Sequence, residues 1–319
     1  MTPFIAVTDK AWFDFLSSRA RNGLVDEVNF WSPRATRPMK RMDPGEPVML
    51  RLKHPHNAIA GYGFFAHFCA LELDRAWDLF DWKNGDEDKL RFLERIGRYR
   101  QLSLIDPRVP RDPLGCTLLR NVIFWPERRW LPWGEEMGWA KNIVQGKSEN
   151  DPMRGELLLR ALAEDAPDEI EFKADSFKPL VADERMIASA SQVLREGQGT
   201  FRARLLDVYD GRCAITGEHT QPVLDAAHIQ PYLGPRSNHV QNGLVLTKEF
   251  HALFDRGYVT ITPDYVVRVS ERLRSDWANG KRYYPYDGAK LVHVPDDRRA
   301  RPSPEALEWH AKRVFLDVA

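Results

Sequence analysis

The chain has 319 residues, and its 46 Lys and Arg residues balance 46 Asp and Glu residues, so the formal net charge is zero. This balance excludes binding to nucleic acid or to a membrane through overall charge. A partner of either kind would have to bind to a local patch of basic residues. Hydrophobic residues make up 43% of the chain, which excludes global disorder and suits about two folded domains.

Three further features bear on the compartment. No stretch approaches the roughly 18 apolar residues of a membrane helix, and the first residues do not have the pattern of a signal peptide. Cys69, Cys116 and Cys213 lie far apart, which excludes a disulfide framework and a Cys-x-x-Cys zinc site. We therefore expect a protein of a bacterial-type cytoplasm with no membrane partner.

Residues 1–150 have the pattern of a mixed, mostly β domain. Apolar runs between turn signals predict strands at 4–8, 47–53, 57–65 and 118–125. Helical periodicity predicts helices at 11–19, 74–81 and 87–99. Asp9 is expected to cap the first of these helices, because its carboxylate can accept a backbone N–H of the first turn.

Residues 151–199 change in character. A short helix is expected from 153 to 164, followed by a stretch rich in Asp, Glu and Lys and by a second helix at 185–195. We interpret this segment as a partly helical linker between a domain at 1–150 and a domain at 200–319.

Residues 200–319 alternate short helices and strands. Strands are expected at 224–229, 259–261 and 266–269, and 211–217 is expected to be a strand and turn. The expected helices cover 201–209, 248–255 and 303–315.

Three polar residues in this domain follow one another at short spacing. His228 ends an expected strand, Asn242 lies in the segment that leads into the next helix, and His251 begins that helix. His251 and Asp255 are four residues apart and share a helix face. One nitrogen and one oxygen ligand on that face suit a hard or borderline divalent cation.

These residues stand in motifs that resemble the HNH endonucleases of the ββα-metal fold. The motifs are Ala-Ala-His-Ile-x-Pro-Tyr from 226, Asn-Gly-Leu-x-Leu from 242 and His-x-Leu-Phe-Asp from 251. Phe201-Arg202, residues 213–217 and Gly257-Tyr258 are similar to the same branch of the family, and the resemblance covers about 200–319.

The resemblance implies phosphodiester hydrolysis with one Mg²⁺ or Mn²⁺ ion, with other transition metals as alternatives. It implies that His228 is the general base, that Asn242 braces the loop, and that His251 and Asp255 hold the metal. Many relatives carry a further ligand at the position of Ala227. Asp225, on the same strand face as Ala227, is the alternative ligand in this chain.

Basic residues near these motifs are candidates for phosphate contacts, with solvated surface charge as the alternative. In the second domain these are Arg212, Lys248 and Arg256. In the first domain a basic run follows Trp31 and comprises Arg34, Arg37, Lys40 and Arg41.

The first domain resembles the PUA superfamily, which includes the EVE, ASCH, YTH and SRA-like readers of modified or flipped bases. The resemblance rests on residues 4–9, 29–33, 45–48, 59–64, 115–125 and 142–147. A flipped base needs aromatic walls and polar edges. The candidates for such a pocket are Asn29, Phe30, Trp31, Ser32, Tyr62, Phe64 and Trp82, and the alternative is that these aromatics form the core of a small barrel.

The expected fold is α+β, with a PUA-like β-barrel and flanking helices, a helical linker and a ββα-metal HNH nuclease domain. This combination resembles the modification-dependent (type IV) restriction endonucleases. It implies metal-dependent cleavage of double-stranded DNA carrying methyl- or hydroxymethylcytosine, in antiphage defence, by a homodimer or by two copies meeting on DNA. Three alternatives stay open: an HNH effector gated by a nucleotide or partner protein, a catalytically silent DNA-binding module, and cleavage of RNA.

Overall fold

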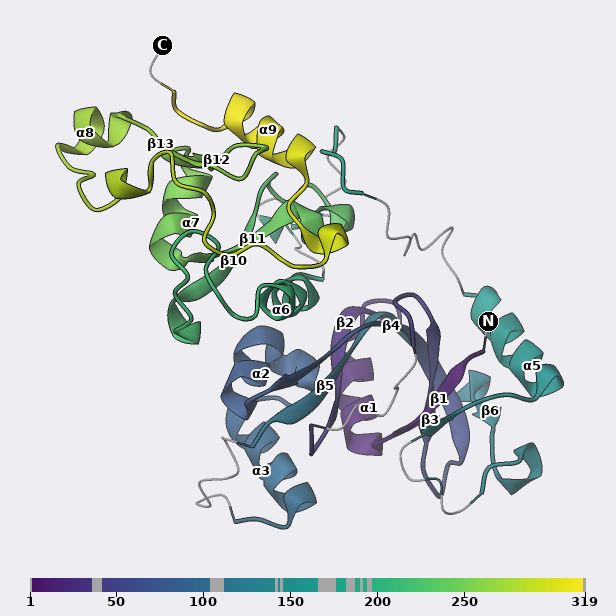
Figure 1. The fold of residues 1–319 in the computed structure, drawn as a ribbon. Coiled ribbons are helices and arrows are strands. Elements are labelled where there is room, and N and C mark those ends of the chain that lie inside the picture. The colour runs from purple at the N-terminus through teal and green to yellow at the C-terminus, as the bar shows by residue number, and fades with distance from the viewer. Residues whose placement is uncertain are drawn as a thin grey trace. The chain divides into compact units, whose positions relative to one another are not determined.

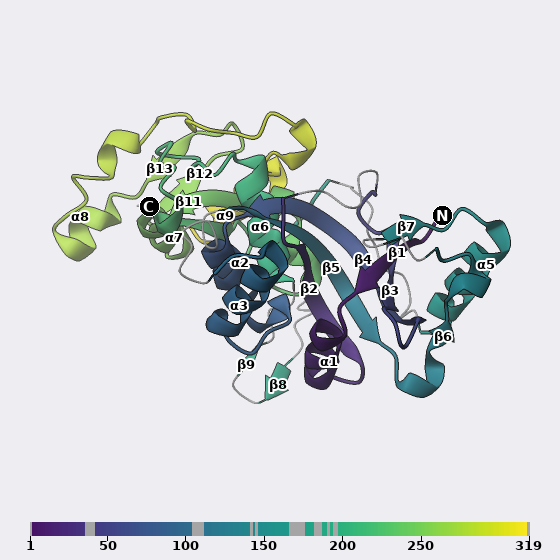
Figure 2. The same cartoon turned by 90° about the horizontal axis from the view of Figure 1, so that it is seen from below.

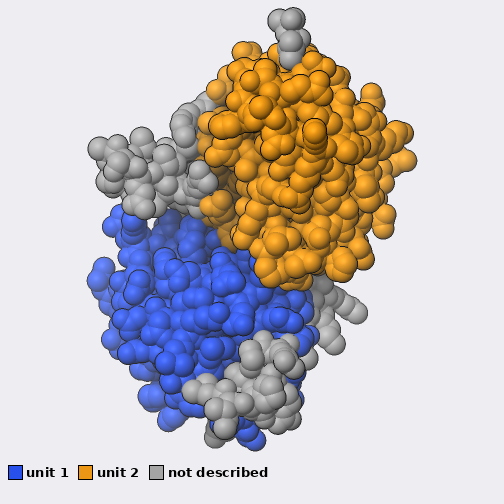
Figure 3. Space-filling model, turned by 90° about the vertical axis from the view of Figure 1, so that its left-hand side faces the viewer, with its two compact units in different colours: residues 1–172 blue, residues 173–319 orange. Residues whose placement is uncertain are grey.

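The computed structural model describes residues 2–35, 42–103, 112–140, 143, 146–165, 176–181, 187–189, 192–193 and 197–317. The chain divides into two compact units, residues 1–172 and 173–319 (Figure 3). Both units contain helices and mostly antiparallel strands, so the predicted α+β class is confirmed. In the described part of the chain, no helix is long and apolar enough to cross a membrane.

Unit 1 is built on one mixed sheet of seven strands in the order β2-β5-β4-β3-β1-β7, with β6 paired to β4. β1 runs parallel to β3, and the other pairs are antiparallel. The strands are β1 (Phe4–Thr8), β2 (Leu24–Ser32), β3 (Pro47–Leu52), β4 (Ala58–Leu71), β5 (Leu114–Phe124), β6 (Leu131–Pro132) and β7 (Gly146–Ser148).

The helices of unit 1 are α1 (Lys10–Arg19), α2 (Leu73–Phe80), α3 (Lys89–Arg100) and α5 (Pro152–Ala163). Figures 1 and 2 show α1 lying against the sheet. The Asp9 carboxylate accepts the Trp12 N–H at 3.1 Å and caps α1. Trp12, Phe13 and Leu16 are buried on the helix face that joins the core of the sheet.

The sequence gives no strand signal for most of β2, although β2 pairs with β5 along its length. Asp26 and Glu27 interrupt the apolar alternation that predicts a strand. In the structure the Lys83 ammonium lies 2.8 Å from an Asp26 oxygen and 3.2 Å from a Glu27 oxygen. A cation from a distant segment therefore neutralises the charges that obscure the strand.

Unit 2 packs helices around two strand pairs, β10 (Leu224–His228) with β11 (Gly243–Thr247) and β12 (Val259–Ile261) with β13 (Val267–Val269). Its helices are α6 (Gln198–Val208), α7 (Lys248–Asp255), α8 (Arg272–Trp277) and α9 (Pro304–Arg313). The short 3₁₀ segments η5 (Pro235–Asn238) and η6 (Val240–Asn242) lie between β10 and β11.

Two expected elements are wrong. Residues 211–217 form turns and no strand, because Cys213 N–H donates to the Glu218 carbonyl and Gly217 N–H donates to the Cys213 carbonyl, which closes a loop. In place of the helix expected at 185–195, the structure has the short paired strands β8 (Ile187–Ser189) and β9 (Gln192–Val193). The β-branched residues Ile187 and Val193 are partners in that pair, and such residues favour strands.

Candidate active site

The frame of the site is an antiparallel strand pair followed at once by a helix. β10 and β11 pair so that His228 stands opposite Gly243 and Asp225 stands opposite Leu246. α7 begins at Lys248, directly after the last residue of β11. This continuity places the first turns of α7 beside β10, and the two elements are in contact.

Gly243 allows α6 to pack closely on this frame. A Cβ atom at this position would lie 2.4 Å from Cδ1 of Leu205 and 2.8 Å from Cζ of Phe201. The missing side chain therefore brings Phe201 against the end of β10. The Phe201 ring stacks on the His228 ring with centroids 4.1 Å apart and an interplanar angle of 11°.

The His228 imidazole is also held by a hydrogen bond. Its Nε2 lies 3.0 Å from Oδ1 of Asn238, a buried residue of η5. A carbonyl oxygen only accepts hydrogen bonds, so Nε2 is the donor, and in the neutral imidazole the ring lone pair is then on Nδ1. Asn238 and Phe201 thus fix both the tautomer and the plane of the imidazole.

Asn242 closes the loop between β10 and β11. It is fully buried, and its amide group donates to the carbonyls of Gln230 at 3.0 Å and Ser237 at 2.9 Å. Its Oδ1 accepts the Gln230 N–H at 2.8 Å. The side chain therefore ties both ends of the loop that carries Asn238.

His251 of α7 lies between two carboxylates. Its Nδ1 is 3.0 Å from Asp225 Oδ2, and its Nε2 is 3.4 Å from Asp255 Oδ2. Burial disfavours the imidazolium, but the hydrogen bond to Asp225 and the charges of Asp255 and Asp225 outweigh it and raise the pKa of His251. The site therefore favours positive charge at the place where His251 stands.

Arg202 of α6 supplies the positive charge that pairs with Asp225. Its guanidinium lies 3.1 Å from Asp225 Oδ1 and donates to the Leu224 carbonyl at 3.1 Å. Burial raises the pKa of Asp225, but the hydrogen bond to His251 and the charge of Arg202 outweigh it and lower the pKa. Asp225 is therefore an anionic carboxylate at neutral pH.

The donor atoms at this point fit a divalent cation. Asp225 offers a carboxylate oxygen and His251 an imidazole nitrogen, and Asp255 adds a more exposed carboxylate one helical turn along α7. Among the described residues, no group of three or more His, Cys, Asp or Glu side chains is arranged as a metal site. The fit is therefore that of a two-ligand site completed by water and substrate, in which the carboxylate oxygen suits a hard cation and the imidazole nitrogen a borderline one.

The basic residues proposed for phosphate contacts are scattered. Arg212 precedes the turns at 213–217, and Lys248 and Arg256 stand at the start and just after the end of α7. All three are exposed, as is Arg34 of unit 1. Arg37, Lys40 and Arg41 lie outside the described residues.

The residues expected to line a base pocket are packed into unit 1 in several separate places. Asn29 is fully buried and donates to Asn84 Oδ1 at 2.9 Å, and the Trp31 indole donates to the Asn84 carbonyl at 2.8 Å. Tyr62 and Phe64 are buried core residues of β4. The remaining three residues each have a different neighbour. The Phe30 ring contacts the Trp12 ring, and the Ser32 hydroxyl donates a hydrogen bond to the Arg34 carbonyl. The Trp82 ring lies under the Arg19 guanidinium.

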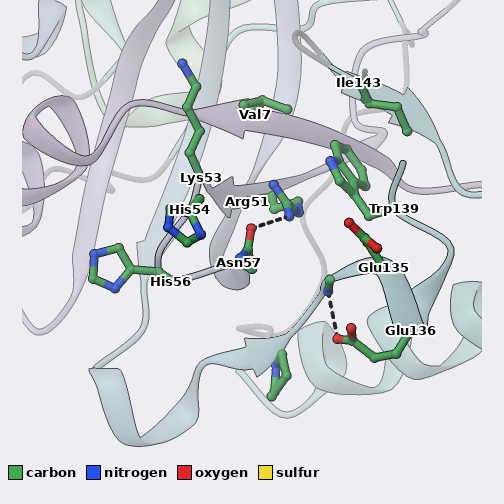
Figure 4. Close-up of a pocket in the computed structure, with 12 residues that line it drawn as sticks. Val7, Arg51, Lys53, His54, His56, Asn57, Glu135, Glu136, Trp139 and Ile143 are labelled. Atoms are coloured by element: carbon green, nitrogen blue, oxygen red, sulfur yellow. Dashed lines mark hydrogen bonds between the residues drawn. The ribbon is translucent and has the colours of Figure 1, made fainter. Parts of the chain in front are cut away.

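The structure therefore does not bring these seven residues together around one cavity. A pocket in the described part of unit 1 is lined by other residues, with Arg51 and Trp139 among them (Figure 4). Sequence reasoning also gave no role to Asn238, Phe201 or Arg202 in holding His228 and Asp225. Phe201 and Arg202 stand in a motif shared with the HNH branch, whereas Asn238 carries no sequence signal.

A comparison with known protein families identifies a domain within unit 2. Residues 213–262, which contain His228, Asn242, His251 and Asp255, match a family described as HNH endonuclease. These residues form an HNH endonuclease domain. The HNH domain makes the chain a nuclease that hydrolyses phosphodiester bonds.

Solved structures give weaker likenesses. The ASCH protein from Zymomonas mobilis has a TM-score of 0.31 and 7% identity over 49% of this chain and 94% of its own. The modification-dependent restriction endonuclease TagI has a TM-score of 0.27 and 13% identity over 91% of this chain and 75% of its own. Scores this low carry no argument about activity, and no curated protein gives a significant match.

Proposed function

We propose that this protein is a divalent-metal-dependent endonuclease that cuts DNA carrying a modified cytosine. Unit 2 is the nuclease, and unit 1 is the reader of the modification. The observation that carries the proposal is the contact between His251 of α7 and Asp225, which stands on the strand that ends in His228. One candidate ligand, Asp225, thus shares a strand with the oriented imidazole of His228, and the other, His251, lies on the helix that follows β11.

We assign the first proton transfer to His228. With Nε2–H directed at Asn238, Nδ1 accepts a proton from a water molecule, and the oxygen of that water attacks the phosphorus. The bond from phosphorus to the leaving oxygen breaks, and that oxygen takes up a proton from solvent. Stacking on Phe201 holds the ring in place through the step.

Asp225 and His251 are the residues that would hold the cation, with Asp255 as the third candidate. When bound, a divalent cation neutralises charge that builds up on the scissile phosphate. Arg202 holds Asp225 anionic and oriented. His251 must bind through a neutral nitrogen, so metal binding displaces the proton that its carboxylate neighbours favour.

The proposal that the substrate carries a modified cytosine rests on the resemblance of residues 1–150 to readers of modified bases. An HNH domain of this small size offers few groups that read base sequence, so selection of the substrate falls to unit 1. A duplex has two strands to cut, so we propose that two copies act together on one DNA.

The nuclease assignment is tested by metal-dependent cleavage of DNA containing methylcytosine. The wild type is expected to cut in Mg²⁺ or Mn²⁺ and to stop in EDTA, and His228→Ala is expected to lose activity while keeping its fold by circular dichroism. His293→Ala, which changes a histidine of the same unit outside the site, is the matched control. Equal activity of His228→Ala and the wild type would contradict the proposal, and no cutting by the wild type would favour a silent module.

A further inference from the structure

Unit 1 contains a pocket of about 890 Å³ beside the ends of β1 and β3. Val7 of β1, Arg51 of β3 and the segment 53–57 line one part of it, and the segment 132–139 lines the other. Its volume lies in the range of sites that enclose a small ligand. None of the residues of the nuclease site contributes to it.

Arg51 is the buried charge of this pocket. Its side chain is 5% exposed, its Nε donates to the Trp133 carbonyl at 2.8 Å, and one terminal nitrogen donates to Asn57 Oδ1 at 3.0 Å. Within the described part of the chain, no carboxylate forms an ion pair with it. Burial lowers the pKa of Arg51 although the charge of Glu136 opposes this, so the site favours a ligand that brings further acceptors to the guanidinium.

Arg51 also stacks on Trp139, which is itself buried. The guanidinium carbon lies 4.5 Å from the centroid of the Trp139 ring. Figure 4 shows the two side chains next to each other in the middle of the pocket. Planar guanidinium groups and indole rings are the surfaces on which proteins stack the bases of nucleic acids.

Basic side chains and carboxylates stand on the two sides of Arg51. Figure 4 shows Lys53, His54 and His56, here called the basic side, away from Glu135 and Glu136, here called the acidic side. The three residues of the basic side are exposed and follow β3 directly. A ligand that fits this polarity is anionic at one end and carries a hydrogen-bond donor at the other.

We propose that this pocket binds a nucleotide, with its phosphate at the basic side, its base against Arg51 and an exocyclic amino group of the base at the acidic side. The inference rests on the proposed function, because this nucleotide is the one that unit 1 reads. Cytosine and its derivatives modified at carbon 5 carry the required amino group. The nucleotide comes either from DNA, as a base turned out of the duplex, or from solution as a free signal.

Binding to the full-length protein separates these two sources. The free probes are methyldeoxycytidine monophosphate, the same nucleoside without phosphate, and thymidine monophosphate, all measured by calorimetry. The DNA probe is a short labelled duplex with one methylcytosine, measured by fluorescence anisotropy with EDTA present. The test variant is Lys53→Glu with His56→Glu, and the matched control is Arg128→Glu, an exposed residue of unit 1 outside the pocket.

The double variant is expected to weaken binding of the cytosine nucleotide or of the duplex by about tenfold or more, because each charged contact contributes strongly to a partly enclosed site. Arg128→Glu is expected to leave binding within twofold, on the order of experimental error. Glu135→Gln with Glu136→Gln is expected to reduce the preference for the cytosine nucleotide over the thymidine nucleotide. These exposed positions avoid the folding defect that replacing buried Arg51 would bring.

Loss of duplex binding alone assigns the pocket to DNA, and loss of free-nucleotide binding alone assigns it to a signal. Absence of binding by the wild type, or equal loss in Arg128→Glu, would overturn the inference. If the double variant still cuts only modified DNA, the pocket assignment fails and the proposed function stands. If the pocket binds the nucleotide but all DNAs are cut equally, the proposed function fails and the pocket assignment stands.

Discussion

His251 Nδ1 lies 3.0 Å from Asp225 Oδ2, although the two residues are 26 positions apart and stand on different elements. The pairing of β10 with β11 and the immediate start of α7 bring them together. Asp225 stands on the strand that ends in His228, so one short strand carries a metal-ligand candidate and the base candidate. The proposed cation site of the domain depends on that relationship.

Removing the negative charge of Asp225 is expected to weaken metal binding strongly. Asp225→Asn keeps the shape of the side chain, but it loses the anionic oxygen next to His251. We expect cleavage to fall by about a hundredfold or more and to need much higher Mn²⁺, because the charge on the scissile phosphate is no longer neutralised. Cleavage rates across a Mn²⁺ titration measure this.

Asp264→Asn, at an exposed turn between β12 and β13, is the control for that variant. It is expected to behave as the wild type. A normal Mn²⁺ requirement in Asp225→Asn would remove Asp225 from the metal site.

Asn238 is expected to act as a positioning residue for His228. In Asn238→Asp a carboxylate replaces the amide beside Nε2, which stabilises the imidazolium and raises the pKa of His228. Since the base must be neutral, the acidic limb of the pH–rate profile is expected to move to higher pH by about one unit. An unmoved limb, or an equal shift in the control Asn279→Asp, would show that Asn238 does not orient the base.

Asn242 is expected to contribute to stability as well as to the site. Asn242→Ala removes three hydrogen bonds in a fully buried place and leaves the polar groups of Gln230 and Ser237 unsatisfied. The free energy of unfolding is expected to fall by about 3 kcal/mol. Urea denaturation followed by fluorescence measures the change, and a loss well below 1 kcal/mol (order of magnitude) would mean that the loop closes without this side chain.

His310 predicts a pH dependence of stability. It is buried, stacks on Phe254 and bonds Thr260 through Nδ1 and the Phe254 carbonyl through Nε2. Burial lowers its pKa to about 4, although the bond to the Phe254 carbonyl opposes this. The unfolded chain therefore binds the proton more tightly, and stability falls as pH drops from about 6.5 toward 4, by up to about 3 kcal/mol.

Comparison with His310→Gln isolates this contribution. Asp86 in unit 1 contributes to the pH dependence of stability with the opposite sign. Burial raises its pKa to about 6 despite the charges of Arg95 and Arg98, so the folded protein binds this proton more tightly than the unfolded chain. Denaturation of both proteins at several pH values is expected to show a smaller loss on acidification in His310→Gln. Parallel pH profiles would contradict the assignment.

The sequence predicts the local elements of the nuclease site well. The expected helix at 248–255 has the bounds of α7, and the expected strand at 224–229 is one residue longer than β10. Apolar periodicity and turn residues determine these elements locally, and the HNH motifs then identify His228, Asn242 and His251.

Contacts between distant segments could not be predicted in the same way. Stacking of Phe201 on His228 depends on the packing of α6 over Gly243, which no local pattern encodes. Unit 1 illustrates the same limit, because aromatic residues on β4 have the same composition signal whether they line a pocket or fill a core. Tyr62 and Phe64 are core residues, whereas the pocket is built around Arg51, whose burial the sequence does not reveal.

The most direct test of the account is the ratio of cleavage rates on matched duplexes in Mg²⁺. The duplexes carry cytosine, methylcytosine, hydroxymethylcytosine or glucosylated hydroxymethylcytosine at the same positions, and His228→Ala is measured beside the wild type. The account predicts cutting of a duplex with modified cytosine at least about a hundredfold faster than the unmodified one, with both rates lost in the variant. Equal cutting of all four duplexes by the wild type would contradict it.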